Sequence, residues 1–257
     1  MINLLDAYFV RLAKWKIFQV LAALMLAGGI FIALFMRDKM MVYEMPFFMA
    51  TLLFPVYIGI VTGVFNYPLF TNGTIRNQLA VGHKRGNIFI ADWLVTNVFA
   101  VGLFLVFTLG NLVMAKILDA PGDVCWNKIY IGIVLSSLQI ILSTTITQLF
   151  SVIFKGVKSF IAIYLGNQIL LLMGVGAMTL EEIPKAVLYF FPSVVCLNFQ
   201  YFNIPGNPLM GGANGLEVAE SLERMSFEFL PAAGATILEI AVVFIIADLY
   251  FRKTDFN

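Results

Sequence analysis

Long unbroken apolar segments constrain this chain more than any other feature of its sequence. Roughly 20 apolar residues suffice to cross a bilayer as a helix, which satisfies its own peptide groups where lipid offers no hydrogen-bond partners. Apolar residues make up 61% of the chain and charged residues only 12%, whereas soluble domains carry about 25% charged residues. The sequence therefore predicts an all-α integral membrane protein and excludes a soluble domain or a disordered chain.

Six segments qualify as crossings, and residues 1–257 are interpreted as one transmembrane domain. The crossings are Ile17–Met36, Pro46–Phe65, Ile88–Ala115, Ile129–Phe154, Ser159–Leu180 and Pro231–Phe251. The ten-residue alternating segments of a β-barrel are not the pattern of this chain. A seventh apolar run, Ala186–Phe202, is short and interrupted by polar residues, so we interpret it as re-entrant or interfacial.

The basic residues are divided unequally between the two sides that six crossings define. One side holds ten, namely Arg11, Lys14, Lys16, Arg76, Lys84, Arg85, Lys155, Lys158, Arg252 and Lys253. The other side holds six, namely Arg37, Lys39, Lys116, Lys128, Lys185 and Arg224. Because cytoplasmic segments carry the excess of Lys and Arg, we expect the first side and both termini to be cytoplasmic. A net charge of +1 leaves no basic surface for nucleic acid.

Three segments lie outside the crossings. Residues 1–16 are predicted to form an amphipathic interfacial helix, since apolar side chains recur there at helical spacing, at Leu4, Leu5, Tyr8, Phe9 and Leu12. The alternative is that this segment extends the first crossing inward. Residues 181–230 form a long outer segment.

The third segment, residues 72–86, is cytoplasmic. A short helix from about Ile75 to Val81 is expected there, with Asn72 or Thr74 as its N-cap and Gly82 at its end. Two interpretations are open: a helix that receives force from a cytosolic partner, or an amphipathic loop on anionic headgroups.

The fourth crossing carries an unusually polar face, made of Ser136, Ser137, Ser143, Thr144, Thr147, Gln148 and Ser151. Such a face should not meet lipid, so it either packs on neighbouring helices or lines a translocation route. Polar partners are available on the third and fifth crossings, at Asn97, Thr108, Asn111, Asn167 and Gln168. The pathway candidates are Ser137, Thr144, Gln148 and Glu239.

Three carboxylates fall within or at the edge of crossings. Glu239 lies near the middle of the sixth, where a charge costs roughly 2.5–3.5 kcal/mol on insertion scales. Asp92 and Asp248 lie nearer the cytoplasmic face, where hydration or pairing with Lys84, Arg85 or Arg252 is expected. Gly59 and Gly63 form a Gly-x-x-x-Gly that permits close helix packing.

Motifs of enzymatic chemistry are missing from the sequence. It contains no Gly-x-x-x-x-Gly-Lys-Ser/Thr phosphate loop, no His-Glu-x-x-His and no Gly-x-Ser-x-Gly. A single histidine, His83, and two cysteines, Cys125 and Cys196, argue against a metal site. We expect no catalytic residue, no metal and no cofactor in this chain.

The segment Asn72-Gly73-Thr74-Ile75-Arg76-Asn77-Gln78-Leu79-Ala80-Val81-Gly82-His83-Lys84-Arg85 resembles the segment after the second crossing in small permeases of the type-two class of ABC exporters. The Gly-Thr-Ile-Arg-Asn start and the Val-Gly-x-x-Arg end carry the resemblance. The amphipathic N-terminal helix, the six crossings and the long outer segment also fit that class.

The resemblance implies a bacterial cell-membrane permease that pairs with a second permease, as a homodimer or with a sister subunit. Each permease would bind a separate cytosolic ATPase that holds ATP and Mg²⁺ and powers export of an amphipathic or hydrophobic substrate, most often a peptide. Residues 72–86 would be the coupling helix, with Thr74, Ile75, Arg76, Gln78, Leu79, Lys84 and Arg85 as the ATPase-coupling residues. Residues 181–230 would form short helices that dip into the outer leaflet.

Two other functions remain open. One is an ion- or proton-coupled secondary transporter centred on Glu239, which would need no ATPase. The other is a membrane anchor or assembly factor, for which the polar fourth crossing would have little use.

Overall fold

The computed structural model describes residues 2–37, 42–43, 45–52, 54, 57, 59, 61–65, 74–120, 126–154, 166, 169, 184–191 and 229–254. All regular structure within these residues is helical. The helices are α1 (Ile2–Lys14), α2 (Lys16–Phe35), α3 (Met45–Leu52), α5 (Thr74–Ala80), α6 (Arg85–Ile117), α7 (Trp126–Phe154), α9 (Lys185–Leu188) and α12 (Phe229–Lys253).

Four of these helices are long and apolar enough to cross a membrane: α2, α6, Ile129–Phe154 within α7, and α12. They match the first, third, fourth and sixth predicted crossings. Their length and apolar composition identify the chain as a membrane-embedded protein. The second crossing is described only in α3 and at separate helical residues up to Phe65. The fifth crossing, apart from Gly166 and Ile169, and most of residues 181–230 lie outside the described residues, so the predictions made for them are not tested.

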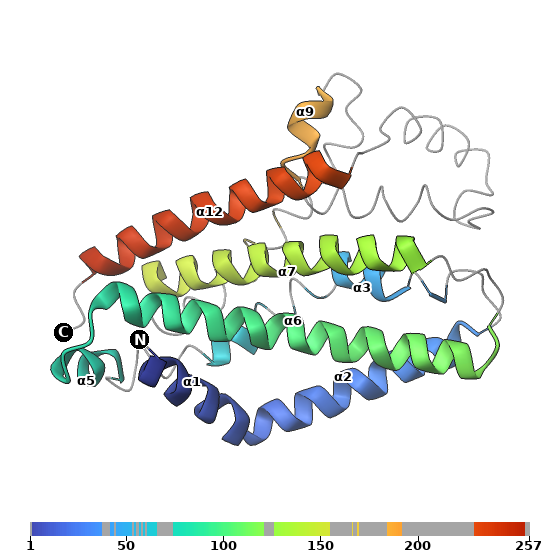
Figure 1. The fold of residues 1–257 in the computed structure, drawn as a ribbon, viewed down its shortest axis with the longest axis horizontal. Coiled ribbons are helices and arrows are strands. Elements are labelled where there is room, and N and C mark those ends of the chain that lie inside the picture. Colours follow the sequence, from blue (N-terminus) through green and yellow to red (C-terminus); the bar gives the residue numbers. More distant parts are fainter. Residues whose placement is uncertain are drawn as a thin grey trace.

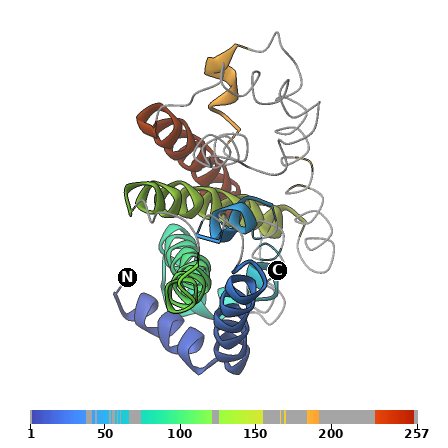
Figure 2. The ribbon, with the colours of Figure 1, turned by 90° about the vertical axis from the view of Figure 1, so that its right-hand side faces the viewer.

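The long helices form a bundle with α6 and α7 in its middle. Figures 1 and 2 agree that α2 lies on one side of this pair and α12 on the other, and the most extensive packing is of α2 on α6 and of α12 on α7. At 33 residues, α6 is about 50 Å long, so it spans the roughly 30 Å hydrocarbon layer with length to spare.

The N-terminal amphipathic helix is a separate helix rather than an inward extension of the first crossing. Trp15 adopts an extended conformation, with φ −75° and ψ 105°, and separates α1 from α2. Its ring packs against Phe65 and Phe99, with centroids 5.3 and 6.2 Å away. Leu4, Tyr8 and Leu12 of the predicted apolar face of α1 are buried in the core that α6 shares with α5. Leu5 is half-buried and packs against this core, whereas Phe9 is exposed, so the prediction holds for only part of the face.

Small residues bring α2 and α6 into close contact. A Cβ at Gly29 would lie 2.2 Å from the carbonyl oxygen of Phe107, and one at Gly110 would lie 2.8 Å from that of Leu26. The Asn111 side-chain amide donates to the Gly29 carbonyl at 3.5 Å. The close contact between α2 and α6 therefore depends on Gly29 and Gly110, which the sequence pattern did not single out.

Candidate functional site

The predicted cytoplasmic helix is present as α5, and it ends as predicted at Gly82. This glycine has φ +95°, a left-handed conformation that side chains disfavour. The N–H of His83 donates to the Gln78 carbonyl, and the N–H of Gly82 donates to that of Leu79. These two bonds are a Schellman motif, so the end of α5 is fixed by local hydrogen bonding.

One side of α5 is anchored to the bundle. Ile75 is 3% exposed and lies in the same core as residues of α1 and α6, and Leu79 packs against that core. The Tyr8 hydroxyl of α1 donates to Oε1 of Gln78 at 3.2 Å. Three of the predicted coupling residues, Ile75, Gln78 and Leu79, therefore hold α5 in place rather than face outward.

The other side of α5 is open. Arg76, Asn77 and Ala80 are exposed, and so is Lys84 in the link to α6. Val81 is 79% exposed, a high value for a branched apolar side chain. Thr74 is half-buried and forms an interaction within the protein. Of the predicted set, Arg76 and Lys84 remain as outward-facing residues, and Asn77 and Val81 join them.

Arg85 ties the start of α6 to the end of α12. Its Nη1 donates to the carbonyl oxygens of Arg252 and Thr254, each at 2.8 Å. Carbonyls in the last turn of a helix lack intrahelical donors, and a guanidinium supplies them. Arg85 is therefore committed to α12, and it joins two crossings at the end of the bundle where α5 lies (Figure 1).

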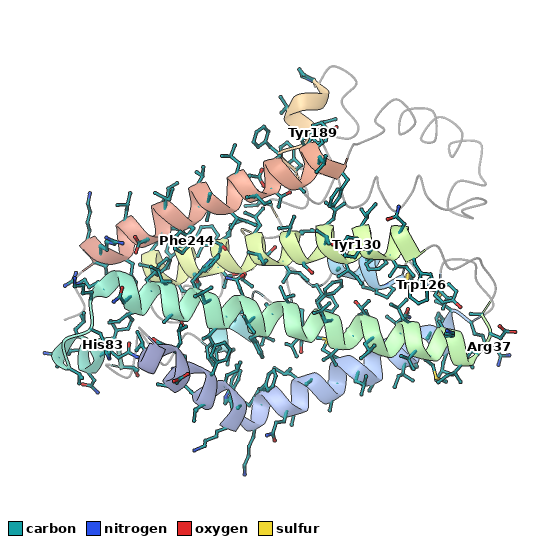
Figure 3. All side chains as sticks on the ribbon, in the orientation of Figure 1. Arg37, His83, Trp126, Tyr130, Tyr189 and Phe244 are labelled. Carbon is teal, nitrogen blue, oxygen red and sulfur yellow. The ribbon has the colours of Figure 1, made fainter. Side chains whose placement is uncertain are left out.

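Basic side chains gather at this same end. α5, the start of α6 and the end of α12 meet there and bring Arg76, Lys84, Arg85, Arg252 and Lys253 to one end of the bundle (Figure 1). Figure 3 shows His83 at this end and Arg37 at the opposite end. Asp248 pairs with Arg252 at 2.7 Å, which confirms one of the pairings expected for that carboxylate.

The polar face of α7 lies against α6, and three side-chain pairs join the two helices. Gln148 Nε2 donates to Asp92 Oδ2 at 3.1 Å, Trp93 Nε1 donates to Thr145 Oγ1 at 2.9 Å, and Thr144 is hydrogen-bonded to Asn97. Positions that rise along α7 meet positions that fall along α6, as antiparallel helices require. We call these six residues the α6–α7 seam.

Several hydroxyls of α7 are satisfied by their own helix. Thr145, Thr147 and Ser151 each donate to the carbonyl oxygen four residues earlier, at 2.6 to 2.9 Å. Ser136, Ser143, Thr144, Thr147, Gln148 and Ser151 are buried, and Ser137 is half-buried. Of the two interpretations of this face, packing against a neighbouring helix fits Thr144 and Gln148, since both bond to side chains of α6. The pathway role stays a prediction.

The expectation that Asp92 is hydrated or paired with Lys84, Arg85 or Arg252 is wrong, since its carboxyl is buried and bonds to Gln148 instead. Asp92 lies two helical turns into α6 and is only 7% exposed, because that turn faces α7 rather than the end of the bundle. Two other polar residues of α6 that were predicted as partners of the α7 face, Thr108 and Asn111, are buried. Asn111 bonds to Gly29 of α2 rather than to α7. Asn167 and Gln168 lie outside the described residues.

Glu239 is separate from the seam bonds. It is half-buried on α12, and its Oε2 is buried with no hydrogen-bond partner among the described residues. The structure therefore places Thr144 and Gln148 together on α7, against α6, and places Glu239 on another helix.

Sequence reasoning missed the Trp93–Thr145 and Asp92–Gln148 pairs and the role of Arg85 at α12. The two pairs could have been suggested by placing the third and fourth crossings side by side as antiparallel helices and aligning their most polar turns. Comparison of the sequence with protein-family models and with curated proteins finds no match.

Proposed function

We propose that this chain is the membrane-spanning permease subunit of an ATP-driven exporter, and that α5 docks on a separate cytosolic ATPase. The observation that carries the proposal is the two-sided arrangement of α5. Its buried side is fixed to the bundle through Ile75 and Gln78. Its open side presents Arg76, Asn77 and Val81.

Such an arrangement suits the transmission of force. A docked helix passes on a push only when it is tied to the elements that must move, and three ties are present. α5 leads within a few residues into α6, Tyr8 links it to α1, and Arg85 links the start of α6 to the end of α12. A displacement of α5 would therefore reach α1 and α6 directly, and α12 through Arg85 of α6.

The proposal places the energy source in a separate ATPase, which agrees with the lack of a phosphate loop in this sequence. The basic residues at the α5 end favour a cytoplasmic location for that end, where an ATPase has access to ATP and Mg²⁺. Both termini then lie in the cytoplasm of a bacterial cell.

The substrate is proposed to be an amphipathic or hydrophobic molecule, most often a peptide, that moves along an interface with a second permease. This part rests on the resemblance of residues 72–86 to the type-two exporter class. The α6–α7 seam supplies polar side chains inside the membrane, and a change in helix packing would expose them.

The test is co-purification of the full chain from its own cells in a mild detergent, with mass spectrometry of the associated proteins. A phosphate-loop ATPase should be present in stoichiometric amount. It should be lost with Arg76→Glu and with Val81→Asp, since both side chains are exposed and neither has a hydrogen bond or ion pair to another described residue. Lys253→Glu is the matched control, because it reverses an exposed charge at the same end without touching α5.

Intact chain that binds no ATPase would overturn the proposal. Equal loss in the Lys253→Glu control would show that general charge at this end, rather than α5, makes the contact. Size-exclusion profiles that match wild type would show that the variants fold.

A second function is favoured by one observation: Oε2 of Glu239 is buried and has no hydrogen-bond partner among the residues that the structure describes. In this alternative the chain is an ion- or proton-coupled transporter. Purified protein in vesicles would then move solute without ATP or an ATPase, and Glu239→Gln would abolish that movement. Gradient-driven transport that survives in Glu239→Gln would remove this candidate.

A further inference from the structure

The Asp92–Gln148 pair is bonded on one side only. Both residues are buried, at 7% and 2% exposure, and Gln148 Nε2 donates to Asp92 Oδ2 at 3.1 Å. The other oxygen of each group, Oδ1 of Asp92 and Oε1 of Gln148, is buried and has no hydrogen-bond partner in the part of the chain that the structure describes.

A count of donors and acceptors explains the two orphaned oxygens together. An ionised carboxylate and an amide oxygen are both acceptors only, so neither can satisfy the other. Leaving a buried polar atom without a partner destabilises the folded chain. A single proton on Asp92 Oδ1 converts that atom into a donor. Gln148, which already donates to Oδ2, can accept this proton's hydrogen bond at its own unbonded oxygen, Oε1. Asp92 and Gln148 would then form the two-bond ring of a carboxylic acid and a primary amide.

The surroundings of Asp92 contain few charges. From α1, Arg11 and Tyr8 are close enough to interact electrostatically with Asp92. Arg11 donates from Nη2 to the Phe65 carbonyl oxygen at 3.3 Å, and its guanidinium lies 5.1 Å from the centre of the Phe65 ring. Tyr8 donates to Gln78.

The remaining neighbours of this stretch of α6 are a neutral amide, aromatic rings and charges that bond elsewhere. α7 contributes Gln148, and α12 packs Phe244 against Trp93 and against Phe89. On α12, Asp248 pairs with Arg252, and Arg85 of α6 bonds to the α12 carbonyls. On α6 itself, one turn beyond Asp92, Thr96 Oγ1 is a further buried oxygen that no described residue hydrogen-bonds.

We propose that Asp92 is a proton-binding site, and that its bound proton joins α6 to α7 through a neutral acid–amide pair with Gln148. Release of the proton leaves Asp92 Oδ1 and Gln148 Oε1 as two buried acceptors without a donor among the described residues, which loosens the seam at this turn. This site is assigned from hydrogen bonding in the bundle, and it does not depend on the exporter proposal.

The test uses the purified full chain in detergent at neutral pH, with two substitutions at the site. Asp92→Asn copies the neutral acid, because its amide can donate to Gln148 Oε1 while its oxygen accepts from Nε2. We expect the thermal unfolding midpoint of Asp92→Asn to match wild type and that of Asp92→Ala to fall. Asp248→Asn, which removes a carboxylate that is ion-paired, is the control and should lower the midpoint.

A second readout detects the proton itself. The spectra are recorded in a Glu239→Gln background, because Glu239 also has a buried carboxyl oxygen without a hydrogen-bond partner among the described residues. Infrared spectra of this protein should contain the carbonyl stretch of a protonated carboxylic acid, and adding Asp92→Asn should abolish it, whereas adding Asp248→Asn should keep it. A Glu239→Gln spectrum without this band, or an Asp92→Asn variant that unfolds as easily as Asp92→Ala, would overturn the proposal in favour of an ionised Asp92 balanced by Arg11. A midpoint that rises when Na⁺ replaces choline at constant ionic strength would assign the oxygens to a metal cation instead.

Discussion

The substitution Gly29→Ala gives the most direct test of how closely α2 packs on α6. The new Cβ would lie 2.2 Å from the Phe107 carbonyl oxygen, 2.9 Å from the Asn111 nitrogen and 3.1 Å from the Phe107 carbonyl carbon, all of them backbone atoms. Real Cβ contacts are essentially never shorter than 3.0 Å. The oxygen contact alone must lengthen from 2.2 Å to at least 3.0 Å, a shift of 0.8 Å between two rigid helices.

The energetic cost follows from this shift. A gap of about 0.5–1 Å loses a quarter to a half of the dispersion energy of each contact it opens, and overpacking of a core costs about 1–3 kcal/mol. The separation would also stretch the Asn111–Gly29 hydrogen bond, which is already 3.5 Å long. We therefore expect Gly29→Ala to destabilise the chain by about 1–3 kcal/mol.

Gly102→Ala is the matched control on α6. A Cβ at Gly102 would have no atom of another described helix within 4 Å, so this variant gains only the helix preference of Ala over Gly, about 1 kcal/mol. Thermal unfolding in a mild detergent, followed by loss of the monodisperse peak in size-exclusion chromatography, ranks the three proteins. The order should be Gly102→Ala, wild type, Gly29→Ala. A Gly29→Ala protein as stable as wild type would refute the close crossing.

Three further predictions concern single side chains. Asp119 ends α6 with φ 48°, a conformation that costs a non-glycine residue roughly 1 kcal/mol, so Asp119→Gly should raise the unfolding midpoint and Asp119→Ala should not. Burial raises the pKa of Tyr8 above its ordinary value of about 10. Its neutral form therefore stabilises the fold fully below that pH, and the contribution is lost as pH rises above it. Tyr8→Phe should accordingly flatten the alkaline loss of stability in a pH series of thermal melts, and a curve as steep as wild type would contradict this assignment. Arg85→Gln removes the charged donor to two carbonyls at the end of α12. It should speed amide exchange in residues 250–254 and cost about 1 kcal/mol, whereas Lys84→Gln should leave exchange there unchanged.

The local features of the fold were predictable from the sequence because they depend on residues a few positions apart. Four apolar segments predicted α2, α6, α7 and α12, since length and hydrophobicity alone decide whether a helix suits a bilayer. The spacing of Leu4, Tyr8 and Leu12 predicted the buried face of α1. Gly82 predicted the end of α5, because its left-handed conformation and the two closing hydrogen bonds lie within six residues.

The partners across helices were decided by the tertiary structure. Apart from the polar face of α7, hydrophobic residues occupy nearly all sides of the long helices. The sequence pattern therefore leaves most of their rotations about their own axes, and their register against one another, unset. Gly29 meets Phe107 and Asp92 meets Gln148 only because α2, α6 and α7 settle at particular depths and rotations. The same register places Arg85 against α12 rather than on an outer surface. The sequence by itself thus determined which segments are helices and where several of them end, and packing between helices determined what each polar side chain bonds.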